Sequence, residues 1–258
     1  MGAGRAGQRL MVVMPHPDDE CFSTACTIAR YASEGATISL LTLTRGGGGL
    51  WNGRDAGDLR PLTEVREMEL REAARALGVA SVEVLDYPDG ALEKVEEVEA
   101  TRDRCLGDIV RAIRTHRPQV VVTFGPEGVY GHPDHKAVSR LTVQACSLAG
   151  DPNRFELESA ALGLSPWYPS KLYFQSANSA TVKALELPTP APITTRVRTE
   201  GFEEAKIKAF TAHRSQTQEW GPLRKVIEGQ NGEEVFSLVG AAEGLHESDL
   251  FQGVALSG

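Results

Sequence analysis

Two short motifs hold the residue types best suited to chemistry in this chain. The first, at residues 15–20, reads PHPDDE, and the second, at residues 132–135, reads HPDH. Together they contain three of the six histidines. Imidazoles and carboxylates gathered in this way are typical of a catalytic metal site or of general acid–base catalysis.

The spacing within the motifs predicts one metal ion held by two histidines and one carboxylate. His16 and Asp19 are three residues apart, so both side chains can point the same way in a turn or a first helical turn. His135 could supply the third ligand and leave one position open for water, as in catalytic zinc sites. We therefore expect Zn²⁺ as the cofactor, although the same ligands also suit Fe²⁺.

The other motif residues could complete a catalytic site around this ion. Asp18 is a spare carboxylate that could take a proton from the bound water. His132 is a spare imidazole, suited to face the substrate carbonyl or the leaving nitrogen, and Asp134 could orient it from behind.

Each motif alone also has a purely structural explanation. Asp18, Asp19 and Glu20 could simply favour the N-terminus of a helix through its dipole. His132 and His135 could be surface histidines at the start of another helix. The metal hypothesis therefore depends on a fold that brings the two motifs together.

The pattern of the first half predicts such a fold. Apolar runs predict strands at 10–14, 37–43, 82–85 and 120–124, and helical patterns run to about 33 and over 61–77, 96–115 and 133–148. This alternation indicates βαβ units and a Rossmann-like, doubly wound, mostly parallel sheet of the α/β class. In the order 3-2-1-4-5, strands one and four are neighbours, and both motifs lie at their carboxyl ends, where such sheets bind ligands.

The second half is less regular from about residue 151. Strands are expected at 171–175, 193–197 and 235–239, and a helix at 200–211. The glycine run at 46–49 continues as a polar stretch to about residue 60 and favours a mobile loop. The simplest interpretation is a single α/β domain over residues 1–258.

Composition excludes several classes of partner. The formal net charge of −8 argues against nucleic acid, and no apolar run of about 18 residues could span a membrane. The four cysteines lack a paired spacing, which indicates reduced, mostly buried thiols in a cytoplasmic protein and makes a cysteine-based zinc site improbable.

The two motifs resemble those of the LmbE/PIG-L-like N-acetylglucosaminyl deacetylase family, which includes mycothiol- and bacillithiol-type deacetylases. Both motifs are intact, and softer similarities occur along almost the whole chain, at 41–46, 66–78, 87–90, 212–216 and 248–251. The resemblance implies a metal-dependent hydrolase that removes the acetyl group from a small acetylated amino sugar. Members of the family can be oligomeric, so a homo-oligomer is compatible with this chain.

The resemblance also implies roles for single residues. It places zinc on His16, Asp19 and His135, and it makes Asp18 the general base, His132 a protonated stabiliser or general acid and Asp134 the residue behind His132.

Three residues outside this core of the site also receive implied or suggested roles. Tyr130 resembles a tyrosine that helps to polarise the substrate carbonyl, and Arg66 matches an arginine that contacts the sugar or its acyl group. Arg45 could bind substrate or could only pair with a carboxylate. Residues 50–53 after the glycine run match no family pattern that we recognise, which leaves the choice of aglycone open.

Other functions remain open on the sequence alone. The same zinc site could serve a thiol-conjugate amidase, and the chain could also be a non-catalytic metal- or sugar-binding module. A nucleotide-binding Rossmann-like module is disfavoured because no Gly-x-Gly-x-x-Gly follows the first strand.

Overall fold

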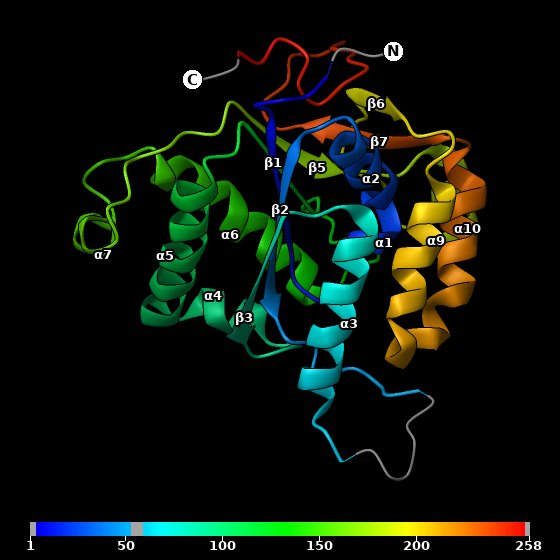
Figure 1. Ribbon diagram of the computed structural model, residues 1–258, viewed down its shortest axis with the longest axis horizontal. Coiled ribbons are helices and arrows are strands. Elements are labelled where there is room, and N and C mark those ends of the chain that lie inside the picture. Colours follow the sequence, from blue (N-terminus) through cyan, green and yellow to red (C-terminus); the bar gives the residue numbers. More distant parts are fainter. Residues whose placement is uncertain (1–3, 53–58, 256–258) are drawn as a thin grey trace.

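One twisted sheet forms the centre of the computed structural model, which describes residues 4–52 and 59–255 (Figure 1). Within these residues seven strands pair in the order β3-β2-β1-β4-β5-β7-β6. They are β1 (Arg9–Met14), β2 (Thr37–Thr44), β3 (Ser81–Tyr87), β4 (Val120–Thr123), β5 (Lys171–Gln175), β6 (Thr195–Arg198) and β7 (Glu233–Leu238). The first five strands are parallel, and β7 runs antiparallel to both β5 and β6.

The predicted strand order 3-2-1-4-5 and the α/β class are confirmed. β1 lies between β2 and β4, with Leu10 opposite Ile38 on one side and Val120 on the other. These three side chains are fully buried, as expected for parallel strands covered on both faces. Because β1 and β4 are adjacent and parallel, the segments after them leave the sheet at the same edge.

Helices cover both faces of this sheet (Figure 1). On one face α4, α5 and α6 pack against one another, and on the other face α2, α3 and α9 do so. These helices are α4 (Leu92–Glu97), α5 (Glu99–His116), α6 (Pro133–Ala149), α2 (Ala25–Ser33), α3 (Leu62–Leu77) and α9 (Glu203–Ala212). The shorter or later helices are α1 (Glu20–Ser23), α7 (Glu156–Ala161), α8 (Ser179–Leu185), the 3-10 helix η1 (Arg214–Glu219) and α10 (Trp220–Gln230).

The structure differs from the predicted helices in ways that have local causes. The first helix is interrupted at Thr24, whose φ of −133° is not helical, and the helix predicted at 96–115 is divided at Val98, which is extended. α3 ends as predicted at Gly78, which adopts a left-handed φ of 76°. α10 was not predicted because Gly221 and Pro222 look like helix breakers, yet proline fits the first turn of a helix, as it does here.

All four cysteines are free, and all four are buried, as their expected packing role requires. No helix in the described part of the chain is both long and apolar enough to cross a membrane.

A fully buried ion pair joins the second half of the chain to the first. Lys206 Nζ on α9 lies 3.3 Å from Glu234 Oε1 on β7, and both side chains are fully buried. Glu234 also accepts hydrogen bonds from the backbone N–H groups of Cys26 and Thr27 at the start of α2, at 3.2 and 2.8 Å. Lys206 donates to the carbonyl oxygen of Phe22 as well. The pair thus fixes the two short helices that follow the first motif.

Replacing Glu234 by glutamine should destabilise the fold, because it leaves the Lys206 ammonium buried without its counter-charge. We expect the free energy of unfolding in urea to fall by about 3 to 5 kcal/mol. The neighbouring Glu233→Gln is the matched control, since Glu233 forms a half-exposed pair with Arg196 at 3.4 Å, and it should cost less than about 1 kcal/mol. Equal losses in the two variants would contradict the anchoring role of Glu234.

Candidate metal centre and active site

The two histidine motifs meet at the carboxyl edge of the sheet, as predicted. His16 follows β1, whereas His132 and His135 follow β4 at the start of α6. The ring centroid of His16 lies 5.1 Å from that of His132 and 5.4 Å from that of His135. Residues separated by more than a hundred positions therefore share one site because their strands are neighbours.

The three predicted metal ligands lie together. His16 Nδ1 is 3.1 Å from Asp19 Oδ2, and His135 Nε2 is 3.4 Å from Asp19 Oδ1. The three potential ligand atoms all lie within 4.8 Å of one another, and all three residues are buried. A single ion with bonds of about 2.0 to 2.2 Å to nitrogen and oxygen fits a set of this size.

The surroundings of His16 decide which of its nitrogens can bind a metal. Its Nε2 lies 3.0 Å from Asp134 Oδ2 and 3.0 Å from Asp89 Oδ1. Ionised carboxylates only accept hydrogen bonds, so Nε2 must carry a proton. Nδ1 is then the nitrogen left free for a metal, and it faces the carboxylate of Asp19. This arrangement, a carboxylate behind a ligating imidazole, is the usual support of a metal-bound histidine.

Without a metal, a proton between His16 Nδ1 and Asp19 Oδ2 is favourable, because both atoms are otherwise hydrogen-bond acceptors. Burial lowers the pKa of His16, but hydrogen bonds to Asp134, Asp19 and Asp89 outweigh burial and raise the pKa well above its ordinary value. Two facing acceptors need a positive species between them. A divalent cation supplies that charge equally well, which supports the fit of a metal here.

The two other ligands are in the protonation states that metals require. Burial lowers the pKa of His135 to about 4, so its imidazole is neutral at pH 7. Its ring stacks on Phe124 with centroids 4.1 Å apart, and its buried Nδ1 has no hydrogen-bond partner in the described structure. Burial raises the pKa of Asp19, but the nearby His135 and His16 lower it by more. The pKa is therefore below its ordinary value, and the carboxylate is ionised.

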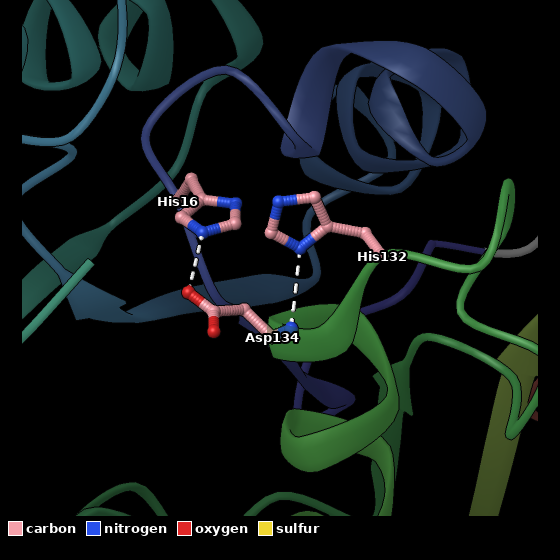
Figure 2. Close-up of side chains that lie close together, drawn as sticks. All are labelled: His16, His132 and Asp134. Atoms are coloured by element: carbon pink, nitrogen blue, oxygen red, sulfur yellow. Dashed lines mark hydrogen bonds and ion pairs between the residues drawn. The ribbon is translucent and has the colours of Figure 1, made fainter. Parts of the chain in front are cut away.

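The expected support of His132 by the Asp134 carboxylate is wrong. The carboxylate contacts His16 and accepts hydrogen bonds from the backbone N–H groups of Gly90 and Leu92, at 2.7 and 2.9 Å. Only the backbone N–H of Asp134 reaches His132, at 3.2 Å from Nδ1 (Figure 2). The Asp134 side chain points toward the loop after β3 because the backbone N–H groups of Gly90 and Leu92 donate hydrogen bonds to it there. Asp134 therefore positions the first motif rather than its own neighbour.

This contact also corrects the expected protonation of His132. Because Nδ1 accepts the backbone N–H, the neutral ring carries its proton on Nε2. Burial and the nearby charge of His16 both lower the pKa of His132, so the surroundings favour the neutral form. In Figure 2 its second nitrogen points toward His16 and away from α6. These contacts favour a neutral His132 that can donate a hydrogen bond from Nε2, whereas the resemblance implies a protonated one.

Asp18 is a buried carboxylate in a strained backbone. Its φ is 107°, a left-handed value that non-glycine residues rarely adopt and that is concentrated at functional sites. Burial raises its pKa to about 7, although Arg66 acts in the opposite direction. A carboxyl group with this pKa can both accept and return a proton near neutrality.

The predicted substrate ligand Arg66 is mainly engaged with the protein. Its Nη2 donates to Asp18 Oδ2 at 3.1 Å, and its Nη1 donates to the carbonyl oxygen of Gly46 at 2.9 Å. A Cβ on Gly46 would lie 2.6 Å from the guanidinium, and Gly46 has a left-handed φ of 68°. The glycine run thus makes room for Arg66. The later part of the predicted loop, residues 53–58, lies outside the described residues.

Arg45 and Tyr130 occupy different surroundings. Arg45 pairs with Glu67 at 2.9 Å and is not among the described residues that line the main cavity, so its structural interpretation is favoured. Tyr130 is 63% exposed, and its ring centroid lies 5.7 Å from that of His132 and 5.4 Å from that of His135. Its hydroxyl can therefore be offered to a molecule beside the metal ligands.

A cavity of about 670 Å³ opens onto these groups. Its lining includes all three predicted ligands and several polar residues that sequence reasoning did not assign to the site, among them Asp89, Glu127, Gln175, Gln218 and Glu219. Asp89 stands in an Asp-Gly pair, which by itself favours a turn. Its position directly after β3, at the same sheet edge as both motifs, is the signal that could have revealed it. The glutamines and Glu219 come from the less regular second half, where no pattern indicated them.

Two other groups of described residues have metal-ligand spacing but are already satisfied. In the group of His16, His132 and Asp134, the Asp134 oxygens already accept backbone and imidazole hydrogen bonds. In the group of Glu20, Cys21 and His213, Glu20 Oε1 lies 2.7 Å from His213 Nε2 and accepts from the Cys21 thiol at 3.2 Å. The latter is a buried structural network.

Replacing Asp134 by asparagine should weaken metal binding without removing a ligand. The variant loses the carboxylate that holds the His16 Nε2–H, and changes of this kind typically reduce metal affinity about 10- to 100-fold. Titration against a competing chelator measures the effect, and Asp86→Asn, at an exposed position on β3, is the control. Unchanged affinity in Asp134→Asn would show that Asp134 does not support His16.

Known proteins resemble this chain in sequence and in fold. Residues 11–146 match the family model described as PIG-L: GlcNAc-PI de-N-acetylase. A 1D-myo-inositol 2-acetamido-2-deoxy-alpha-D-glucopyranoside deacetylase of Streptomyces scabiei is 33% identical, over 97% of this chain and 91% of that protein. A conserved protein of Thermus thermophilus is 29% identical, with a TM-score of 0.67 over 88% of this chain and 92% of its own.

The fold is also that of the N,N'-diacetylchitobiose deacetylase of Pyrococcus horikoshii. That structure gives a TM-score of 0.72 at 24% identity and covers 90% of this chain and 84% of its own. The family match includes both motifs, and the Streptomyces relative extends the similarity over nearly the whole chain. The chain therefore belongs to the PIG-L family of de-N-acetylases.

Proposed function

We propose that the protein is a zinc-dependent hydrolase that removes the acetyl group from a small molecule containing N-acetylglucosamine. One observation carries the proposal: three buried metal-ligand atoms lie beside a strained carboxylate whose pKa is about 7, at the wall of a large cavity. Amide hydrolysis needs an activated water, a base and a stabilised oxyanion, and this arrangement offers all three. The names of the relatives supply the substrate class.

The ion would be held by His16 Nδ1, Asp19 and His135 Nε2. When bound, it would lower the pKa of a water molecule and polarise the acetyl carbonyl. Two neutral imidazoles and one carboxylate suit zinc, which in catalytic sites also binds a water molecule. Fe²⁺ is the alternative for the same ligands.

Asp18 acts as the general base. It accepts a proton from the attacking water, and its ion pair with Arg66 keeps the carboxylate oriented toward the site. Because its pKa is near 7, the protonated carboxyl can then give the proton to the leaving amine. This second role replaces the one expected for a protonated His132. Acetate and the free amino sugar are the products.

The oxyanion that forms on the acetyl oxygen needs hydrogen-bond donors. His132 can donate from Nε2 while it stays neutral, since its Nδ1 is occupied by a backbone N–H. The hydroxyl of Tyr130 is a second donor at the mouth of the cavity. Loss of one such donor typically costs about 3 to 4 kcal/mol of transition-state stabilisation.

Asp18→Asn should keep the metal and lose turnover. Asparagine tolerates a positive φ better than most residues, so the strained backbone at 18 is preserved. We expect acetate release from an N-acetylglucosamine glycoside to fall by about 10²- to 10⁴-fold, the usual contribution of a general base. Metal content by mass spectrometry serves as the control. Near wild-type turnover at full metal content would rule out Asp18 as the base.

Removal of the metal should abolish the reaction reversibly. Dialysis against a chelator should reduce acetate release to background, and one equivalent of Zn²⁺ per chain should restore it. Fe²⁺ under anaerobic conditions is the parallel arm that compares the two metals. Full activity in the chelated, metal-free protein would contradict the proposal.

A further inference from the structure

The main cavity has an apolar side that the metal chemistry does not use. α8, α10 and the segment after α8 contribute it, and its side chains are Leu185, Leu187, Pro188, Pro190, Pro222 and Val226, which we call the apolar wall. Between residues 177 and 190, and between 222 and 226, none of the described lining residues is charged. This composition contrasts with the polar lining around the metal ligands.

The two helices present regular rows of side chains to the cavity. Thr181 and Leu185 are four residues apart on α8, and Pro222 and Val226 are four apart on α10. Residues with this spacing lie on one face of a helix, so both rows point into the same space. Leu187 and the prolines at 188 and 190 extend this surface beyond α8.

The wall is preformed because α8 and α10 are tied together. The Asn178 side chain accepts from the backbone N–H of Thr181 at 2.9 Å and donates from Nδ2 to the carbonyl oxygen of Gly229 at 2.6 Å. A Cβ on Gly229 would lie 2.3 Å from Thr181 Oγ1, so the two helices approach closely at this point. A preformed wall binds a ligand without first paying the cost of ordering itself.

The strand order places the wall beside the metal centre. β5 pairs with β4, and the chain passes from Gln175 at the end of β5 through Ser176 and Ala177 to α8. All three residues line the cavity together with the metal ligands. The wall therefore lies on the β5 side of the metal centre, and Asp89 lies on the β3 side.

We propose, resting on the function proposed above, that the substrate is an N-acetylglucosamine glycoside whose aglycone is apolar and packs on this wall. An acetyl group ends in one methyl, so it cannot fill the apolar side, and the group linked to the sugar must do so. The six side chains of the wall are all apolar, so a polyhydroxylated aglycone packed on them would lose hydrogen bonds with water that these side chains cannot replace. An aromatic or aliphatic aglycone gains free energy by burial on the same surface.

A series of glycosides tests this preference in the zinc-loaded enzyme. Acetate release is compared for the methyl, benzyl and inositol glycosides of N-acetylglucosamine. The benzyl glycoside should have a kcat/KM about tenfold above that of the methyl glycoside, in the range typical of added apolar contact, and the inositol glycoside should not exceed the methyl one. Equal values, a preference for inositol, or a preference for longer N-acyl chains on the methyl glycoside would overturn the proposal.

A variant of the wall locates the preference. Leu187→Asn should raise KM for the benzyl glycoside about tenfold and change the methyl glycoside less than about twofold, because it removes binding made equally in ground and transition states. Leu162→Asn is the matched control, at a position that is 58% exposed and outside the cavity lining. An unchanged ratio of benzyl to methyl glycoside in Leu187→Asn would refute the assignment of the wall.

Binding of the deacetylated products separates this proposal from the function on which it rests. Calorimetry should show that benzyl glucosaminide binds about tenfold more tightly than methyl glucosaminide, and that Leu187→Asn removes the difference. If benzyl glucosaminide binds more tightly but the enzyme releases no acetate, the result contradicts the proposed activity and leaves the proposal on the wall intact. Equal binding of the two glucosaminides would overturn the proposal on the wall, whatever the turnover.

Discussion

The imidazole of His16 is held by carboxylates at both of its nitrogens, and the rest of the site depends on this contact. Asp134 and Asp89 fix the proton on Nε2, which turns Nδ1 toward Asp19. Two acceptors that face each other inside a protein are unfavourable unless a cation lies between them. The fold therefore favours a positive charge at this point, and His135 Nε2 lies 3.4 Å from Asp19 Oδ1 as a third candidate ligand.

The fold makes this convergence possible because each contributor leaves the same edge of the sheet. β3 delivers Asp89, β1 delivers His16 and Asp19, and β4 leads to the residues of the second motif. β1 and β4 are buried and almost wholly apolar, so the polar residues that follow them gather where these strands end. The buried pair of Lys206 and Glu234 then holds the helices after the first motif against the second half of the chain.

Sequence reasoning predicted the sheet and the cluster of His16, Asp19 and His135 because both depend on local patterns. Apolar strands and the two motifs are visible in short windows, and the neighbouring positions of β1 and β4 follow from the general rules for such sheets. Sequence reasoning was wrong where a side chain contacts a segment that is distant in the sequence. The Asp134 carboxylate contacts His16 and accepts hydrogen bonds from two backbone N–H groups in the loop after β3. No pattern near residue 134 could indicate these contacts. The apolar wall was not predicted either, because Gly221 and Pro222 are atypical of a helix interior and α10 was therefore not expected.

The most direct test of this account is the position of the bound ion. Anomalous diffraction at the zinc edge, from crystals of the zinc-loaded protein, would locate it. The account predicts one peak within bonding distance of His16 Nδ1, Asp19 and His135 Nε2, with Asp134 hydrogen-bonded to His16 and not to the ion. A peak bound by Asp134 or by His16 Nε2, or no peak beside Asp19, would contradict it.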